Sequence, residues 1–387
     1  MPHIAGLRGV LPVASKLQEV VGAGARLDVA KELAAGTLVR DPGRSVYRYH
    51  QRFADAATGR TQVRKMVVCA VRIEPWTDGL VRPHEATDPA RKAAVLAQLR
   101  ATRISPAPVF AAYRDAAGEV ERLFRKLDGE RPTLEVTTAD LTVHRLWRAQ
   151  SAELLGQLRH VFAPKKLTVL DGHDRYEAQL AYRDELDASH PLAMYSSANY
   201  ALMCLTGLED PALTVAPRHR AIRGATASQA ALAAARPYFI IEKLAGAASD
   251  LAKQRAALAD SLAHQPAFVV VWAGEPDAWK LTLSPDVSPV DAGVQVNRAL
   301  QKLEPIVADQ LFVERAMPGA KLETHLGADE AFAAKADAVV IMRPLSLEQI
   351  NHVVEIGEVL PPGSTAFVPR LAPGLVSAVV DRDEDLV

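Results

Sequence analysis

Alternating apolar and polar positions predict a β-hairpin near the amino-terminal end of the chain. Residues 46–53 alternate, and residues 63–73 answer them across a turn-rich segment at 55–60. Because side chains alternate sides along a strand, Arg48, His50 and Arg52 lie on one face. We interpret this basic face in two ways, as an anion-binding surface or as the solvated side of an edge strand.

Short apolar runs and stretches of helical spacing alternate through the next part of the chain. Runs bounded by turn residues predict strands at 109–113, 133–137, 167–170, 199–205 and 213–216. Helical spacing predicts helices at 89–103, 116–127, 146–159 and 176–186. The first of these helices begins at Asp88-Pro89, since an aspartate caps free amides and a proline suits the first helical position. The pattern predicts a mixed α/β (α+β) fold, with mixed sheets flanked by helices.

An alanine-rich, helical composition over residues 225–263, broken near Pro237, indicates a boundary between two units. We therefore expect one α/β domain over residues 1–224 and a second mixed α/β domain over residues 225–387. In the second domain the pattern predicts strands at 268–273, 279–283 and 338–342. A capping box from Ser346 to Gln349 opens a helix at 347–358, and the tail at 381–385 is expected to fray.

The composition and charge of the chain argue against a nucleic-acid-binding, membrane-spanning or secreted protein. Apolar residues make up 49% and charged residues 24%, and 45 basic against 46 acidic residues give a net charge of -1. This balance offers no field for extensive nucleic-acid binding, and no apolar run approaches the length that crosses a bilayer. With only two cysteines, Cys69 and Cys204, and no secretory signal, we expect a cytoplasmic protein. Its oligomeric state stays open, a homo-oligomer included.

The candidate chemistry lies where the strand at 167–170 ends in Asp171-Gly-His-Asp-Arg175 and a helix follows. A glycine turn at a helix start presents free amides to an anion. Arg175 adds a forked pair of donors, and His173 can move a proton near neutral pH. Asp171 can hold a magnesium ion or orient the histidine. The alternative is a plain Asp-Gly turn followed by a solvated helix start.

Several segments together resemble a bacterial family known as domain of unknown function 1015. They span nearly the whole chain in order: 47–53 with 59–61, 82–87, 104–110, 144–147, 171–178, 215–220, 361–365 and 374–376. The segment Asp171-Gly-His-Asp-Arg175 is similar to the Asp-Gly-His-His-Arg motif of that family. The motif is in turn similar to the ParB/sulfiredoxin-like nucleotide-binding fold, which includes kinases that phosphorylate free serine and nucleotide-dependent partitioning proteins.

The resemblance implies a nucleotide site and a set of residues for it. Asp171, Gly172, His173 and Arg175 would contact phosphates, and Glu85 would take a proton from an acceptor hydroxyl. The same cleft would be lined by residues 83–85, by Arg218, His219 and Arg220, and by the hydroxyls of Ser364 and Thr365. The implied activity is a phosphotransferase that uses ATP or another nucleotide, with magnesium, on a small hydroxylated metabolite such as an amino acid. The alternatives are a regulatory protein that binds a nucleotide without consuming it, and an assembly protein with a vestigial pocket.

The sequence departs from the family pattern in three places. Asp174 stands where the family has a second histidine, and it adds negative charge beside the expected phosphate. Gly363 replaces the lysine of a Pro-Pro-Lys-Ser-Thr motif, and the usual Pro-Pro-Tyr-Asp segment is not recognisable in residues 1–38. Zinc spacing, a Gly-x-Ser-x-Gly elbow and a P-loop are all missing from the sequence. The departures favour a changed substrate or a loss of catalysis.

Overall fold

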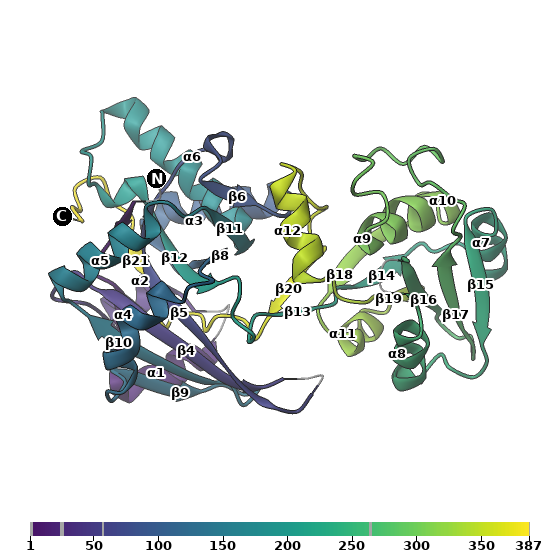
Figure 1. Ribbon diagram of the computed structural model, residues 1–387, viewed down its shortest axis with the longest axis horizontal. Coiled ribbons are helices and arrows are strands. Elements are labelled where there is room, and N and C mark those ends of the chain that lie inside the picture. The colour runs from purple at the N-terminus through teal and green to yellow at the C-terminus, as the bar shows by residue number, and fades with distance from the viewer. Residues whose placement is uncertain (1–2, 24–26, 56–57, 263–264, 387) are drawn as a thin grey trace. The chain divides into compact units, whose positions relative to one another are not determined.

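A computed structural model describes residues 3–23, 27–55, 58–262 and 265–386 and divides the chain into two compact units. Unit 1 comprises Met1–Thr214 and Phe367–Val387, and unit 2 comprises Val215–Ala366 (Figure 1). The division after Thr214 differs from the boundary expected after residue 224. The last residues also belong to unit 1, because their contacts are with its sheet and helices. None of the described helices is long and apolar enough to cross a membrane.

Unit 1 is built on a mixed nine-stranded sheet of order β6-β11-β8-β12-β5-β4-β10-β9, with β1 pairing β5. Two neighbouring pairs, β6 with β11 and β8 with β12, are parallel, and the others are antiparallel. The strands are β1 (Ile4–Ala5), β4 (Val46–Ala54), β5 (Thr61–Arg72), β6 (Val81–Pro83), β8 (Val109–Tyr113), β9 (Leu134–Thr137), β10 (Val143–Ala149), β11 (Leu167–Asp171) and β12 (Tyr200–Gly207). Short ladders join β2 (Val10–Pro12) to β3 (Leu38–Arg40) and β7 (Ile104–Ser105) to β21 (Ala378–Val379).

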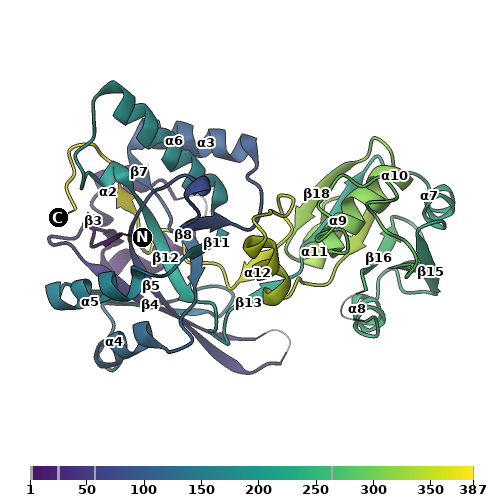
Figure 2. The same cartoon turned by 45° about the horizontal axis from the view of Figure 1, so that its top comes forward.

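Helices cover the sheet of unit 1 and close its core. They are α1 (Leu17–Ala23), α2 (Val29–Ala34), α3 (Pro89–Thr102), α4 (Glu119–Asp128), α5 (Ala152–Phe162) and α6 (His173–Ser189). Apolar side chains of α4 and α5, among them Phe124 and Phe162, pack with the buried residues of β5, β8, β11 and β12. Helices α3 and α6 lie side by side, joined by a smaller core around Leu99 and Tyr182 (Figure 2).

The carboxyl-terminal segment is part of the body of unit 1. Arg103 pairs with Asp381 at 3.0 Å, and Arg40 pairs with Glu384 at 2.6 Å. The amide of Asp381 donates to Ser197 Oγ. The expectation of a frayed tail is therefore wrong for residues 381–385, since polar contacts from three distant parts of the chain hold this segment.

Unit 2 has a six-stranded sheet of order β15-β17-β16-β19-β14-β18, in which every pair is antiparallel. Its strands are β14 (His219–Arg223), β15 (Phe239–Leu244), β16 (Ala267–Trp272), β17 (Ala278–Leu283), β18 (Lys321–His325) and β19 (Ala338–Ile341). Its helices are α7 (Ser228–Ala235), α8 (Leu251–Ala259), α9 (Glu304–Ile306), the π-helix η5 (Val307–Val313), α10 (Glu314–Ala316), α11 (Ala328–Ala333) and α12 (Leu347–Glu355). The chain passes between the units at β13 (Thr214–Ala216) and β20 (Ala366–Val368).

The structure confirms the mixed α/β class, with mixed and antiparallel sheets flanked by helices. The hairpin appears as β4 and β5, although residues 56–57 of its turn lie outside the described residues. Asp88 caps α3 through the amides of Ala90 and Arg91, and Ser346 and Gln349 form the expected capping box of α12. The helix expected at 146–159 is wrong in its first part, because Val143–Ala149 forms β10 between β4 and β9.

Candidate anion-binding site

The strand, glycine turn and helix predicted around residue 171 are present in unit 1. Strand β11 ends at Asp171, Gly172 bends the chain with φ of 89°, and α6 begins at His173. The first helical hydrogen bond runs from the amide of Tyr176 to the carbonyl of Gly172. The amides of His173, Asp174 and Arg175 precede it and have no recorded acceptor within the described residues. This helix start therefore offers donors and the positive end of a helix dipole to an anion.

The guanidinium group of Arg175 folds back over the glycine turn instead of pointing into bulk water. A Cβ atom built on Gly172 would lie 2.5 Å from Arg175 Nη2 and 2.7 Å from its Cζ. Nη2 makes two long contacts, at 3.3 Å to the carbonyl of Pro108 and at 3.4 Å to Asp171 Oδ2. Nε is buried and has no hydrogen-bond partner within the described residues. The guanidinium therefore keeps donor capacity for a ligand.

A cavity of about 340 Å³ in unit 1 opens beside this turn. Its polar lining comes from Asp171, Asp174, Arg175, Arg370 and Gln98. Most of its remaining wall is apolar, with side chains that include Val29, Val95, Pro106, Pro108, Leu371 and Pro373. Concave sites of this size and mixed lining are typical of small-molecule binding.

Positive charge dominates around the carboxylate of Asp171. Burial would raise the pKa of Asp171, but Arg175, His173 and Arg370 outweigh that effect and lower it. The side chain of Asp171 nevertheless keeps 65% of its surface exposed within the cavity. The carboxylate is thus ionised and accessible at neutral pH.

The cavity wall that carries Arg370 is held by a buried polar clamp. Arg64 has no exposed surface and donates to the carbonyls of Val368 and Pro369 and to the side-chain oxygen of Gln51. Gln51 Nε2 donates to the carbonyl of Arg370 at 2.7 Å. Burial lowers the pKa of Arg64 to about 10, so it stays charged at neutral pH. Three successive carbonyls at 368–370 are therefore fixed by strands β4 and β5.

The candidate acid-base residues gather close to the same turn. The rings of His84 and His173 lie 4.9 Å apart, and His84 Nε2 lies 3.3 Å from Glu85 Oε1. His84 Nδ1 donates to the carbonyl of Val169 at 2.7 Å, which turns Nε2 toward the carboxylate. Burial, with a smaller effect from His84, lowers the pKa of His173 to about 4, so His173 is neutral at pH 7. Its buried Nε2 has no hydrogen-bond partner within the described residues.

Five residues expected in the site belong to unit 2, where several have internal partners. Arg220 is fully buried, pairs through Nε and Nη2 with Asp309, and donates from Nη1 to the carbonyls of Arg218 and Gly363. His219 Nδ1 accepts from the amide of Met342, and burial lowers the pKa of His219 to about 4. Arg218 donates to Thr324 Oγ1, and Ser364 Oγ donates to the carbonyl of Pro361. Ser364 and Thr365 are both buried. Arg220 thus joins β14, the π-helix and the Gly363 turn inside unit 2.

Gly363, which replaces an expected lysine, sits in a conformation that only glycine adopts easily. Its φ is 75°, and a Cβ atom there would lie 2.7 Å from Thr324 Oγ1. A lysine at this position would require both a left-handed backbone and displacement of Thr324. The departure from the family pattern is therefore built into the local packing of unit 2.

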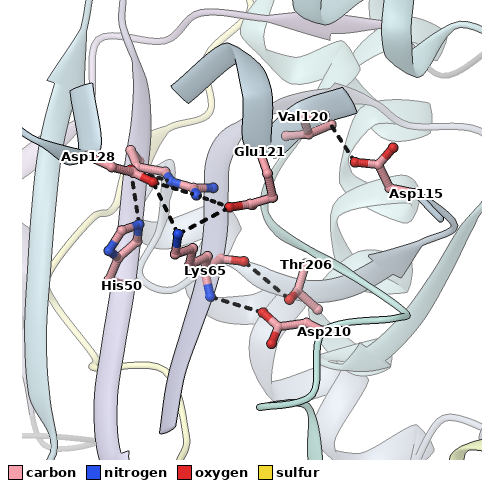
Figure 3. A network of polar contacts seen from close by, with 9 residues as sticks. His50, Lys65, Asp115, Val120, Glu121, Asp128, Thr206 and Asp210 are labelled. Carbon is pink, nitrogen blue, oxygen red and sulfur yellow. Dashed lines mark hydrogen bonds and ion pairs between the residues drawn. The ribbon is translucent and has the colours of Figure 1, made fainter. Parts of the chain in front are cut away.

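The basic face expected on β4 is neutralised inside unit 1. Arg48 is fully buried and pairs with Asp128 at 2.9 Å and with Glu121 at 2.6 Å. Both carboxylates come from α4, and Figure 3 shows them beside His50 and Lys65. His50 lies 3.1 Å from the same Asp128, while Arg52 is exposed. Hydrogen bonds from His50 and Arg48 lower the pKa of Asp128 despite its burial. Because β4 lies between β5 and β10, the interpretation as an edge strand is wrong. Because Arg48 and His50 are buried against carboxylates of α4, the interpretation of this face as an anion-binding surface is wrong as well.

The described residues contain no cluster of three or more His, Cys, Asp or Glu side chains placed to hold a metal ion. Two carboxylates, Asp171 and Asp174, line the cavity. Magnesium is commonly bound by one or two carboxylates together with water and substrate phosphates. Asp171 is therefore the candidate protein ligand for a magnesium ion in this cavity.

Sequence reasoning missed two arginines of this site. Arg370 lies about 200 residues after the glycine turn, and the sequence predicts Arg64 only as part of a hairpin strand. The local signal for Arg64 is weak, because its strand also carries Gln62, Lys65 and Arg72; only the central place of the strand in the sheet requires a buried charge there to be paired. No local signal identifies Arg370, because it reaches the cavity only when the chain returns to unit 1.

A family model described as "Protein of unknown function (DUF1015)" matches residues 11–305. No curated protein sequence matches the chain. Among solved structures, a free serine kinase in complex with AMP is 14% identical, with 79% of this chain and 90% of that chain covered and a TM-score of 0.40. SbnI from Staphylococcus aureus with a C-terminal truncation is 12% identical, with 82% of this chain and 90% of that chain covered and a TM-score of 0.41. A conserved hypothetical protein from Pyrococcus furiosus is 14% identical, with 76% of this chain and 90% of that chain covered and a TM-score of 0.38. At these values the likeness assigns no activity to this chain.

Proposed function

Because the chain belongs to the DUF1015 family of proteins of unknown function, we propose a function from the geometry of its own site. Unit 1 binds the phosphate groups of a nucleotide at the start of α6. The protein uses ATP and magnesium to phosphorylate a small hydroxylated metabolite such as an amino acid. The observation that carries this proposal is the guanidinium of Arg175, folded across Gly172 beside three amides without recorded acceptors.

Each group has a distinct task in the proposed reaction. Arg175 and the amides at the start of α6 bind phosphate oxygens, and Asp171 binds the magnesium ion. The acceptor hydroxyl attacks the γ-phosphorus, the bond to the β-γ bridging oxygen breaks, and ADP leaves. Glu85 takes the proton of the hydroxyl, and its carboxylate lies 3.3 Å from His84 Nε2. The neutral His173 contributes a hydrogen bond to the reacting groups.

A second function is favoured by one specific residue. Asp174 lines the cavity in the first turn of α6, where its negative charge opposes a polyphosphate. This residue favours a regulatory protein that binds a nucleotide and does not turn it over. Both functions need the same phosphate contacts, and they differ in whether a phosphorylated product forms.

The proposal is tested with purified protein, ATP and magnesium against a panel of hydroxylated metabolites, with ADP and phosphorylated product measured by mass spectrometry. Arg175→Ala is expected to weaken ATP binding in calorimetry by about 1.5–3 kcal/mol, roughly 10- to 150-fold. Arg91→Ala is the matched control, since Arg91 is 68% exposed and lies outside the cavity. Saturable binding without product would select the regulatory function. No ATP binding at all would reject both.

A further inference from the structure

The cavity beside α6 is larger than the phosphate groups require. Its volume of about 340 Å³ equals that of about eleven water molecules in the liquid, which is room for a nucleoside-sized group. The charged groups come from the end of β11, the start of α6 and Arg370, and Gln98 comes from α3, while much of the rest of the wall is proline and aliphatic side chains. An apolar wall is favourable for a flat, weakly hydrated ring and unfavourable for phosphate. The cavity therefore has two chemically different parts.

The acidic side of the cavity is suited to hydroxyl groups. Asp174 lines it from the first turn of α6, and its carboxylate accepts no hydrogen bond from the described residues. An ionised carboxylate only accepts hydrogen bonds, so it repels phosphate oxygens and binds hydroxyl donors. Acidic side chains bind ribose hydroxyls in this way in dinucleotide-binding folds. Asp174, unfavourable as a phosphate contact, is favourable as a sugar contact.

Gln98 supplies the neutral polar group of the lining. It comes from α3, and its side-chain amide makes no hydrogen bond with the described residues. An amide presents a donor and an acceptor side by side, as the edge of a nucleobase does. Gln98 can therefore form hydrogen bonds with the edge of a nucleobase whose flat faces lie against the apolar wall.

We propose that this cavity binds the nucleoside half of the nucleotide, with the base on the apolar wall beside Gln98 and the ribose hydroxyls on Asp174. The inference rests on the proposed function, because the phosphates must lie at Arg175 for the base to reach this wall. Its second support is the construction of the wall. The buried Arg64 and Gln51 fix the carbonyls at 368–370, so that Leu371 and Pro373 are presented as a firm surface.

The test compares three probes by calorimetry on the full chain with saturating magnesium: inorganic triphosphate, ATP and 2′,3′-dideoxy-ATP. Wild-type protein is expected to bind ATP at least about tenfold more tightly than triphosphate, from burial of the base. Ala107→Phe, which fills the cavity, should remove this preference and leave triphosphate binding unchanged. Ala116→Phe, at an exposed turn, is the matched control and should behave as wild type. Thermal unfolding confirms that each variant is folded.

The sugar contact is tested separately. Asp174→Asn relieves the repulsion of the triphosphate equally in ATP and in dideoxy-ATP, so the sugar contact is measured by the ratio of the two affinities. Asp174→Asn should lower the preference for ATP over dideoxy-ATP by about threefold to tenfold, while Asp184→Asn on the exposed side of α6 should leave this ratio unchanged. Equal affinity of wild-type protein for ATP and triphosphate would overturn the nucleoside pocket and leave the phosphate site standing. A preference for ATP that survives in Ala107→Phe would overturn it as well. If neither ATP nor triphosphate binds, the proposed function itself fails, and this inference fails with it.

Discussion

Replacing Gly172 with alanine is expected to lower both the stability of the protein and its affinity for ATP, and a control variant separates the two effects. With φ of 89° at this residue, a non-glycine residue costs about 1–2 kcal/mol. The new Cβ would also lie 2.5–2.8 Å from Nη2, Cζ and Nε of Arg175, so the guanidinium must leave its place. A lost charge-assisted contact to phosphate weakens binding by about 1.5–3 kcal/mol, or roughly 10- to 150-fold.

The matched control is Gly79→Ala in the same unit. Gly79 has φ of 69°, and a Cβ there meets open space. Urea unfolding of unit 1 should show a similar loss of about 1–2 kcal/mol in both variants. Calorimetry with ATP and magnesium should show weakened binding in Gly172→Ala alone. Equal ATP affinity in the two variants would refute the role given to Arg175.

Three further results are expected. Arg64→Met removes the donors to the carbonyls of Val368 and Pro369. It should lower the free energy of unfolding by at least about 2 kcal/mol in urea unfolding, and it should also weaken ATP binding in calorimetry. The neutral, buried His173 binds its proton below about pH 4, whereas the unfolded chain binds it below about 6.5, so stability should fall as the pH drops from 6.5 to 4, and the curve of His173→Gln should be shallower. Asp128→Asn should cost about 1.5–3 kcal/mol in the same unfolding assay, because it removes one of the two carboxylates that pair with the buried Arg48 and leaves Glu121, and ATP affinity should not change. A loss of ATP affinity in Asp128→Asn would show that the basic face of β4 contributes to ATP binding.

Local signals in the sequence predicted the elements that local chemistry determines. Asp88 with Pro89, Ser346 with Gln349, and the Asp-Gly step at residue 171 each define a helix start through capping or glycine geometry. The strand, glycine turn and helix start around residue 172 could therefore be predicted, together with Arg175 three residues after the glycine. These features depend on neighbours within one helical turn.

What the sequence could not predict depends on partners distant along the chain. Arg48 appeared exposed because its neutralising carboxylates, Glu121 and Asp128, lie on a helix more than 70 residues away. Strand β15 lies within an alanine-rich region, and its pairing with β17 overrides the helical composition around it. Arg370 joins the cavity only through the return of the chain to unit 1.

A crystal structure of the chain with magnesium and a non-hydrolysable ATP analogue tests the central claim most directly. Phosphate oxygens are expected at about 2.7–3.2 Å from the amides of His173, Asp174 or Arg175 and from the Arg175 guanidinium. A nucleotide bound with its phosphates elsewhere, and with Arg175 still folded over an empty turn, would contradict the account.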